Sequence, residues 1–327
     1  MKPVSSTLHV SAPNCATLKE GIRPEDHSDL TAFRDSLQRK AAKTRSTYIE
    51  SARALAAFTA SKGMPLLEHV EREHLEAFFD FLHAKGNRPA TIRNRQAGLR
   101  ALFNWMVEYD VRKTHPMQRI KLTPIPEGLQ PHYEPIEVAA VLGSIPLRGD
   151  LLAQRDRAVI LFLYDTGLRA QELCDLRIKD VDREARRAEI VSGKGGKGRR
   201  IHYSPTTASA IFKYIRRRGG FEALGPAAPL FAAKDRGPLA VNGLRMIMER
   251  RFKAVSIPFR GIHGFRRSMG QAFLDDGGSG DDLMTLMGWN SLSMLRKYVR
   301  ASAAERALTH HEEHSPVERM LRGGKSP

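Results

Sequence analysis

Residues 165–173 read DTGLRAQEL, and this stretch decides how the second half of the chain folds. The apolar segment that leads into it, at 151–167, predicts a buried helix that ends at Gly167. The segment that follows predicts a short helix whose inward-facing residues are Ala170, Leu173 and Leu176. Arg169 stands at the junction of the two helices, with Glu172 three residues further on. Taken alone, such an arginine is usually a salt-bridge partner.

A glycine-rich loop follows, because residues 193–198 read GKGGKG and fit the G-x-G-x-x-G pattern of dinucleotide-binding loops. A dinucleotide loop must open directly into a helix that receives the pyrophosphate, but RRIHYS at 199–204 predicts a strand. P-loop and kinase motifs are also missing from the residues that follow. Together with RAEIVS at 187–192, the sequence predicts a β-hairpin with a cationic tip, either an exposed turn or a contact to a partner.

Four isolated polar or aromatic side chains occur in the helices of the last third. His263 and Arg266 are one helical turn apart, so both can point the same way. Trp289 precedes a predicted terminal helix, SLSMLRKYVR, that contains Tyr298. Singly, each of these residues more often has a packing or ion-pairing role.

The first half of the chain predicts an arm, a helical domain and a linker. Residues 1–28 lack periodicity and predict a flexible arm, whereas 29–114 hold four helical segments. The apolar stripe of the fourth segment consists of Ile92, Leu99, Leu102, Phe103 and Met106. Arg93, Gln96 and Arg100 share another face, either solvated or in contact with phosphate. The proline-rich stretch 115–135 predicts an interdomain linker.

The composition favours a polyanionic partner. The 327 residues include 53 Lys and Arg against 36 Asp and Glu, a net charge of +17, and neutralising phosphates would release counterions. Two cysteines give no disulfide framework or metal knuckle. Since the chain shows neither a signal peptide nor an apolar run long enough for a membrane span, we expect a soluble protein of the cytoplasm, associated with the nucleoid.

In combination, DTGLRAQEL, the GKGGKG hairpin, HGFRR, LMGW and Tyr298 resemble the signature of the tyrosine recombinases, or phage-type integrases. Lys194 follows Arg169 by 25 positions, Trp289 follows Arg266 by 23, and Tyr298 follows Trp289 by 9, as in simple two-domain, Xer-like bacterial members. The resemblance implies a mainly α fold with a small β-sheet. It implies a four-helix, SAM-like core-binding domain at 29–114, a mixed α/β catalytic domain at 136–310 and a polar tail at 311–327.

The resemblance also implies the chemistry of each site residue. Tyr298 would be the nucleophile, Arg169 and Arg266 would bind the phosphate, Lys194 would be the general acid and His263 the general base. Glu172 would orient Arg169 or His263. Further DNA contacts are expected from Arg45, Arg93, Arg95, Arg100, Lys197, Arg199, Arg200 and Arg267.

Two positions depart from the common family pattern. Trp289 replaces the more usual histidine, and its indole N–H can donate to a phosphate but cannot transfer a proton. Arg267 stands where many relatives have histidine, and we expect it to contact DNA or other protein groups.

The expected partner is double-stranded DNA with inverted-repeat sites, bound by two protomers per site and four in a synapse. Neither metal nor other cofactor is expected, and HHEEH at 310–314 is not the H-E-x-x-H motif of a zinc site. The alternatives are a type IB topoisomerase and a catalytically silent DNA-binding regulator. The sequence leaves open whether the reaction serves integration, element mobility, cassette exchange or dimer resolution.

Overall fold

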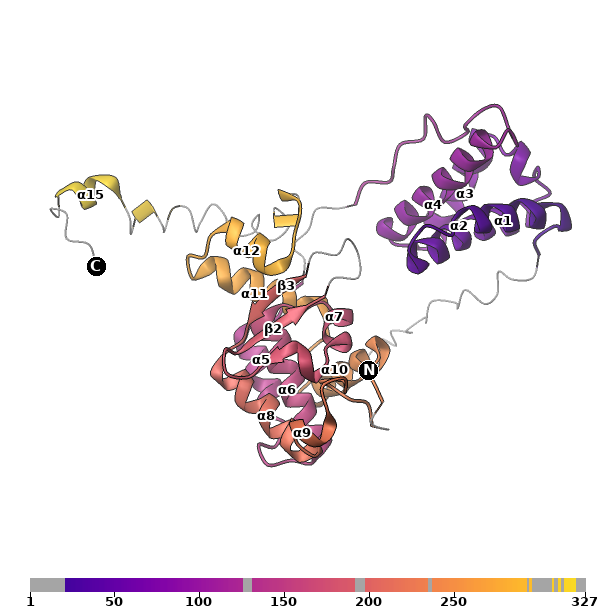
Figure 1. Cartoon of the computed structure of the whole chain (residues 1–327). Helices are drawn as coiled ribbons and strands as arrows, with labels where there is room; N and C mark the ends of the chain where they lie inside the picture. The colour runs from indigo at the N-terminus through magenta and orange to yellow at the C-terminus, as the bar shows by residue number, and fades with distance from the viewer. Residues whose placement is uncertain are drawn as a thin grey trace, which may run out of the picture. The chain divides into compact units, whose positions relative to one another are not determined.

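The computed structural model describes residues 21–125, 131–191, 198–234, 237–292, 294–295, 308, 311–312 and 315–321. The chain divides into two compact units, one up to Gly128 and one from Leu129 onward. The predicted fold class is confirmed, because the described chain is mainly helical with one small antiparallel sheet (Figure 1). No helix among the described residues is long and apolar enough to span a membrane.

The first unit is a helical domain. Its elements are α1 (Pro24–Ser36), α2 (Ala42–Ser61), the 3₁₀ turn η2 (Leu67–His69), α3 (Arg72–Ala84) and α4 (Pro89–Glu108). The predicted stripe of α4 is fully buried and packs with Phe33, Leu55 and Phe78. The four predicted helices of this region are therefore confirmed.

The predicted arm is too long at its C-terminal end, because α1 begins at Pro24 and not after residue 28. Proline at the first helical position and Asp26 in the first turn favour a helix start here. Asp26 is 1% exposed and accepts hydrogen bonds from Leu67 N at 2.8 Å and Arg23 Nε at 3.1 Å. The bond to Leu67, 41 residues away in the sequence, helps to fix the helix start and has no local sequence pattern.

The predicted linker is shorter than 115–135, because its first third packs on the helical unit. Met117 and Ile120 belong to the core of that unit. The polar face of α4 holds the same segment: Gln96 Oε1 accepts from Thr123 N at 2.7 Å, and Arg100 Nη2 donates to Ile120 O at 3.2 Å. At the other end, Tyr133 is already 1% exposed in the core of the second unit.

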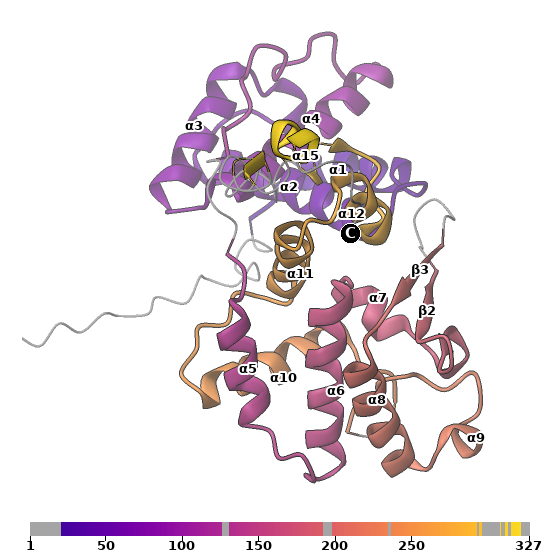
Figure 2. The ribbon, with the colours of Figure 1, turned by 90° about the vertical axis from the view of Figure 1, so that its left-hand side faces the viewer.

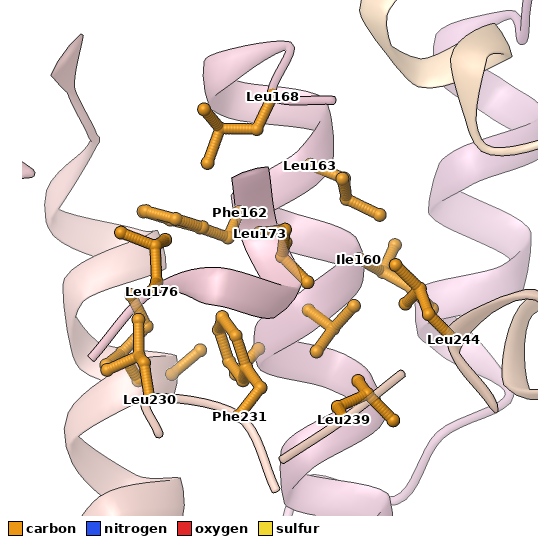
Figure 3. Close-up of a cluster of buried hydrophobic side chains, with 14 of the residues drawn as sticks. Ile160, Phe162, Leu163, Leu168, Leu173, Leu176, Leu230, Phe231, Leu239 and Leu244 are labelled. Carbon is orange, nitrogen blue, oxygen red and sulfur yellow. The ribbon is translucent and has the colours of Figure 1, made fainter. Parts of the chain in front are cut away.

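The second unit surrounds α6 (Leu151–Thr166), which lies beside α8 (Pro205–Arg218) in both views (Figures 1 and 2). Figure 3 shows Ile160, Phe162 and Leu163 of α6 packing with apolar side chains of neighbouring elements. The remaining helical elements are α5 (Pro135–Gly143), α7 (Ala170–Asp175), η3 (Ile178–Asp180), α9 (Phe221–Leu224), α10 (Val241–Ala254), α11 (His263–Asp275), α12 (Gly280–Met287) and α15 (Pro316–Leu321). The last of these lies within the segment predicted as a polar tail.

The predicted hairpin is confirmed, and a third strand, which we did not predict, pairs with it to form the sheet. β2 (Arg187–Ile190) pairs antiparallel with β3 (Arg199–His202), with Ile190 opposite Arg199. The short β1 (Val181–Asp182) pairs with the other edge of β2. Ala188, Ile190 and Ile201 face the core, which fixes the sheet on the helices.

Candidate active site

The end of α6 brings the first site elements together. Gly167 adopts the left-handed conformation, with φ +61°, and its N–H donates to Leu163 O at 3.0 Å. A Cβ at this position would lie 2.9 Å from Met287 Cε, so glycine allows α12 to approach closely. Arg169 follows two residues later as the residue that precedes α7.

Glu172 joins two arginines. Its Oε1 accepts from Arg169 Nη1 at 2.8 Å and from Arg199 Nη1 at 2.9 Å. Its Oε2 accepts from Arg169 N at 2.9 Å and from Arg199 Nη2 at 2.8 Å. Burial raises the pKa of Glu172, but the hydrogen bonds and charges of Arg199 and Arg169 outweigh burial and lower the pKa to about 2. The carboxylate is therefore ionised at neutral pH.

Arg199, which we predicted as a DNA contact, is engaged within the protein. Its side chain is 11% exposed, and its Nε donates to Leu286 O at 2.9 Å, in addition to the two bonds to Glu172. All three guanidinium nitrogens thus have protein acceptors. The sequence predicts a hairpin with a cationic tip. It does not tell which of its arginines point outward and which, like Arg199, bond to α7 and α12 of the same chain.

Arg266 lies at the centre of the site and is 1% exposed. Its Nη1 donates to Gly167 O at 2.7 Å and its Nη2 donates to Met287 O at 2.5 Å. The guanidinium carbon lies 5.4 Å from the centroid of the Trp289 ring, which is within cation–π distance. Arg266 therefore links the C-terminal ends of α6 and α12.

His263 is the first residue of α11 and lies near three arginines. Burial of the imidazole, and then the positive charges of Arg267, Arg266 and Arg169, lower its pKa to about 4. The burial is only partial, because the residue keeps an exposed surface. At neutral pH the imidazole is uncharged, so one ring nitrogen can accept a proton.

Trp289 is 6% exposed and packs with Leu274, Leu283 and Met287 between α11 and α12. Its backbone N–H donates to Met284 O at 2.9 Å. It follows Gly288, whose left-handed conformation ends α12. The segment that leads to Tyr298 in the sequence therefore begins at an anchored tryptophan.

Three predicted site residues, Lys194, Lys197 and Tyr298, lie outside the described residues. The structure brings together Arg169, Glu172, His263, Arg266 and Trp289 from the α6–α7 junction, α11 and the end of α12. These elements lie at the end of the second unit toward which β2 and β3 extend (Figures 1 and 2).

The other predicted DNA contacts of the second unit have protein partners. Arg200 is 73% exposed and pairs with Glu189 across the hairpin at 3.1 Å. Arg267 Nη1 donates to Pro131 O at 2.9 Å, which attaches the start of this unit to α11.

The predicted contacts of the helical unit lie on α2 and α4. Arg45 is half-buried on α2. Arg95 Nη1 lies 3.9 Å from Glu50 Oε2. Arg93 Nη1 donates to Thr123 O at 3.4 Å, and Arg100 holds Ile120 O as described above. The face of α4 that we predicted as solvated or DNA-binding therefore packs, at least in part, against its own chain.

The sequence alone did not identify three backbone groups of the site. These are the carbonyls of Gly167, Leu286 and Met287, which accept from Arg266 and Arg199. Main-chain groups have no residue signature. The sequence does place a glycine at the end of α6 and of α12, and a glycine there indicates a helix end. The last carbonyls of a helix have no partner within it, so they are available to accept hydrogen bonds from other groups.

The comparisons identify the class of protein that this fold and site define. The model of the phage integrase family matches residues 143–305. Over 278 residues, the chain is 28% identical to a tyrosine recombinase XerC of Mycobacterium bovis (strain BCG / Pasteur 1173P2), which covers 83% of this chain and 92% of the relative. A XerC of Syntrophus aciditrophicus (strain SB) is 26% identical over 241 residues, 72% of this chain and 77% of that protein.

Solved structures share the fold. A Tn1549 transposon integrase in complex with transposon right end DNA matches with a TM-score of 0.69 and 19% identity, over 87% of this chain and 98% of that one. XerH bound to a palindromic difH substrate matches with a TM-score of 0.68 and 21% identity, over 87% of this chain and 84% of that one.

The chain belongs to the phage integrase family of tyrosine recombinases, enzymes that cleave and rejoin DNA strands. Its function is that of a site-specific tyrosine recombinase. Neither the topoisomerase nor the silent regulator is favoured by these matches.

Proposed function

We propose that Tyr298 attacks a DNA phosphodiester and that Arg169, Arg266, His263 and Lys194 assist the reaction. The tyrosine oxygen forms a bond to phosphorus, the bond to the 5′-oxygen breaks, and a 3′-phosphotyrosine remains. His263 accepts the tyrosine proton, and Lys194 gives a proton to the departing 5′-oxygen. A 5′-hydroxyl of another strand reverses these steps, so joining needs neither ATP nor a metal ion.

The observation that carries the proposal is the convergence of a neutral histidine and two arginines at the junction of α6, α7 and α11. An uncharged imidazole can accept a proton at neutral pH, and its pKa of about 4 reflects burial and the neighbouring arginines. The arginine side chains offer the N–H groups that stabilise charge on phosphoryl oxygens.

Arg169 and Arg266 contribute differently in this proposal. The Arg169 side chain is 44% exposed, so a phosphate can approach it directly. Arg266 is 1% exposed, so contact with phosphate requires the residues that cover it to move when DNA binds. Trp289 would support Arg266 through its ring and donate its indole N–H to the phosphate.

For the partners, we propose double-stranded DNA with inverted arms, bound by two protomers per site and four in the synapse. The net charge of +17 supports DNA binding, and the Tn1549 integrase and XerH structures contain DNA. The first unit would be the core-binding domain and the second the catalytic domain. Arg45, Arg93, Arg95, Arg100, Lys197, Arg200 and Arg267 remain proposed DNA contacts.

A covalent trapping experiment tests the nucleophile. The protein is incubated with a library of nicked duplex fragments in EDTA, denatured, and recovered with any DNA that remains attached, which is then sequenced. We expect a denaturant-resistant adduct on a defined sequence with wild-type protein. An adduct that persists in Tyr298→Phe would show that another residue is the nucleophile.

The oligomeric proposal is tested with the recovered site. Gel filtration with light scattering should detect two protomers on one duplex and four on a paired complex. A single protomer on each site, under conditions where cleavage occurs, would contradict the proposed dimer.

A further inference from the structure

Arg199 lies on strand β3, but its side chain bonds to two other elements of the site. Its guanidinium meets the Glu172 carboxylate in a two-bond fork, at 2.9 and 2.8 Å, while Nε donates to Leu286 O at 2.9 Å. The side chain is 11% exposed and Glu172 is 12% exposed, so water competes little for these bonds. Lysine cannot reproduce the planar fork, because its ammonium is a single point of charge.

Glu172 in turn holds Arg169, the residue proposed to bind phosphate. It accepts from both the backbone N–H and the Nη1 of Arg169. Together with the bonds from Arg199, the carboxylate receives four hydrogen bonds, two on each oxygen. This arrangement fixes the orientation of Glu172 and therefore the side-chain position of Arg169.

Arg199 also holds the C-terminal end of α12. The last carbonyls of a helix have no partner within it and carry the negative end of the helix dipole. Arg199 caps Leu286 O, and Arg266 caps the next carbonyl, Met287 O. Close packing reinforces the contact, because a Cβ at Gly288 would lie 3.2 Å from Arg199 Cδ. Arg199 thereby connects β3, α7 and the helix that precedes Trp289.

We propose that Arg199 is a positioning residue for strand cleavage, which acts by holding Glu172 and Leu286 O so that Arg169 and the end of α12 keep their mutual geometry. The inference rests on the proposed function of Arg169 and Tyr298. It assigns to Arg199 an effect on the rate of the chemical step and none on the affinity for DNA, because its nitrogens are engaged within the protein.

The test compares Arg199→Lys with wild type on a nicked duplex that carries the trapped sequence. Single-turnover formation of the covalent adduct is measured at saturating protein, and the dissociation constant is measured separately in a Tyr298→Phe background. We expect the cleavage rate to fall about 100-fold, the size of effect produced by a small misplacement of catalytic groups. We expect the protein that carries both Arg199→Lys and Tyr298→Phe to bind DNA with the same affinity as Tyr298→Phe alone.

The matched control is Arg245→Lys. Arg245 Nε donates to Glu249 at 2.8 Å, but this pair lies on the exposed surface of α10. The control removes the same kind of Arg–carboxylate bond and should leave the cleavage rate and affinity unchanged. Melting temperatures of all variants set an assay temperature at which each is folded.

A double-variant cycle decides whether Arg199 acts through Glu172. If it does, Arg199→Lys adds little to the rate loss already caused by Glu172→Gln, whereas independent residues would give multiplied losses. A wild-type cleavage rate in Arg199→Lys, or an equal loss of cleavage rate and DNA affinity, would overturn the inference and leave the nucleophile intact. Absence of an adduct with wild-type protein would instead overturn the proposed function and the inference with it.

Discussion

At the scale of single residues, Glu172 shows how a mostly buried carboxylate can remain charged. Removing it from water favours the protonated form, yet four hydrogen bonds from two arginines favour the carboxylate and lower its pKa to about 2. The site therefore keeps a fixed negative charge between Arg169 and Arg199. Without it, the two guanidinium groups would repel each other with no counter-charge between them.

Glu172→Gln should therefore destabilise the second unit at neutral pH. The depressed pKa corresponds to about 3 kcal/mol of stability, which is present above the ordinary pKa of 4.5 and lost as pH falls toward 2. Chemical denaturation at about pH 7 and about pH 3 should show a large difference from wild type only at the higher pH. The control is Glu189→Gln, which breaks an exposed pair with Arg200 and should cost less than about 1 kcal/mol. Equal effects of the two substitutions would contradict the role given to burial.

His263 gives a second pH prediction, in which stability again falls as pH decreases but over a higher pH range. Its folded-state pKa of about 4 lies below the ordinary 6.5, so between these values the unfolded chain binds a proton that the folded chain does not. Wild-type stability should fall as pH decreases through this window, and His263→Gln should weaken that fall. Melting temperatures between about pH 7 and pH 4 test this. The same substitution at the exposed His69 is the control, and identical pH profiles for wild type and His263→Gln would contradict the assignment.

At the scale of elements, two helices end in left-handed glycines at the site. Gly167 ends α6 and Gly288 ends α12, with φ of +61° at both. Each turn exposes carbonyls that an arginine then caps, so the helix ends form part of the site. The glycines are required because a side chain would be strained and would separate the elements.

Gly167→Ala should destabilise the protein and slow cleavage. The left-handed conformation costs alanine about 1–2 kcal/mol, and its Cβ would meet the buried Met287, which carries the carbonyl bound by Arg266. Gly277→Ala is the control, because Gly277 also has positive φ but nothing within 4 Å of the added carbon. Denaturation and adduct formation should show a greater loss at 167 than at 277. Equal losses would mean that backbone strain alone accounts for the effect.

Local patterns predicted the elements better than they predicted the contacts between them. We predicted the stripe on α4 and the strands on either side of GKGGKG correctly, because the spacing of apolar residues can be read from the sequence. The start of α1 at Pro24 depends on Asp26 bonding to Leu67, 41 residues away. Likewise, Arg93 and Arg100 on α4 meet the carbonyls of the segment after it, and Arg199 reaches Glu172 across the fold. Such long-range polar contacts have no spacing rule from which they could be inferred.

At the scale of the whole molecule, each unit has its own core, and we expect the first to fold alone. A fragment of residues 1–128 contains all of the described core residues of this unit, from Leu30 to Ile120. Its buried charged groups, Asp26 and Arg112, have partners within the same fragment. Thermal unfolding followed by circular dichroism should be cooperative, with the helical content of α1–α4. Phe103→Ala, which removes a fully buried ring, should cost about 3–5 kcal/mol in the fragment. A fragment without cooperative unfolding would show that this unit depends on the other.

Because Trp289 is anchored, it limits how far from the site Tyr298 can lie. Tyr298 follows it by nine positions, and even a fully extended chain of that length spans only about 30 Å. With the indole packed between α11 and α12, this tether defines a sphere outside which the phenol cannot travel, whatever conformation the intervening residues adopt. The same limit keeps the hydroxyl at a high effective concentration near any phosphate held by Arg169. Lengthening the tether would enlarge the accessible volume and lower the effective concentration of the proposed nucleophile, even with every side chain of the site unchanged.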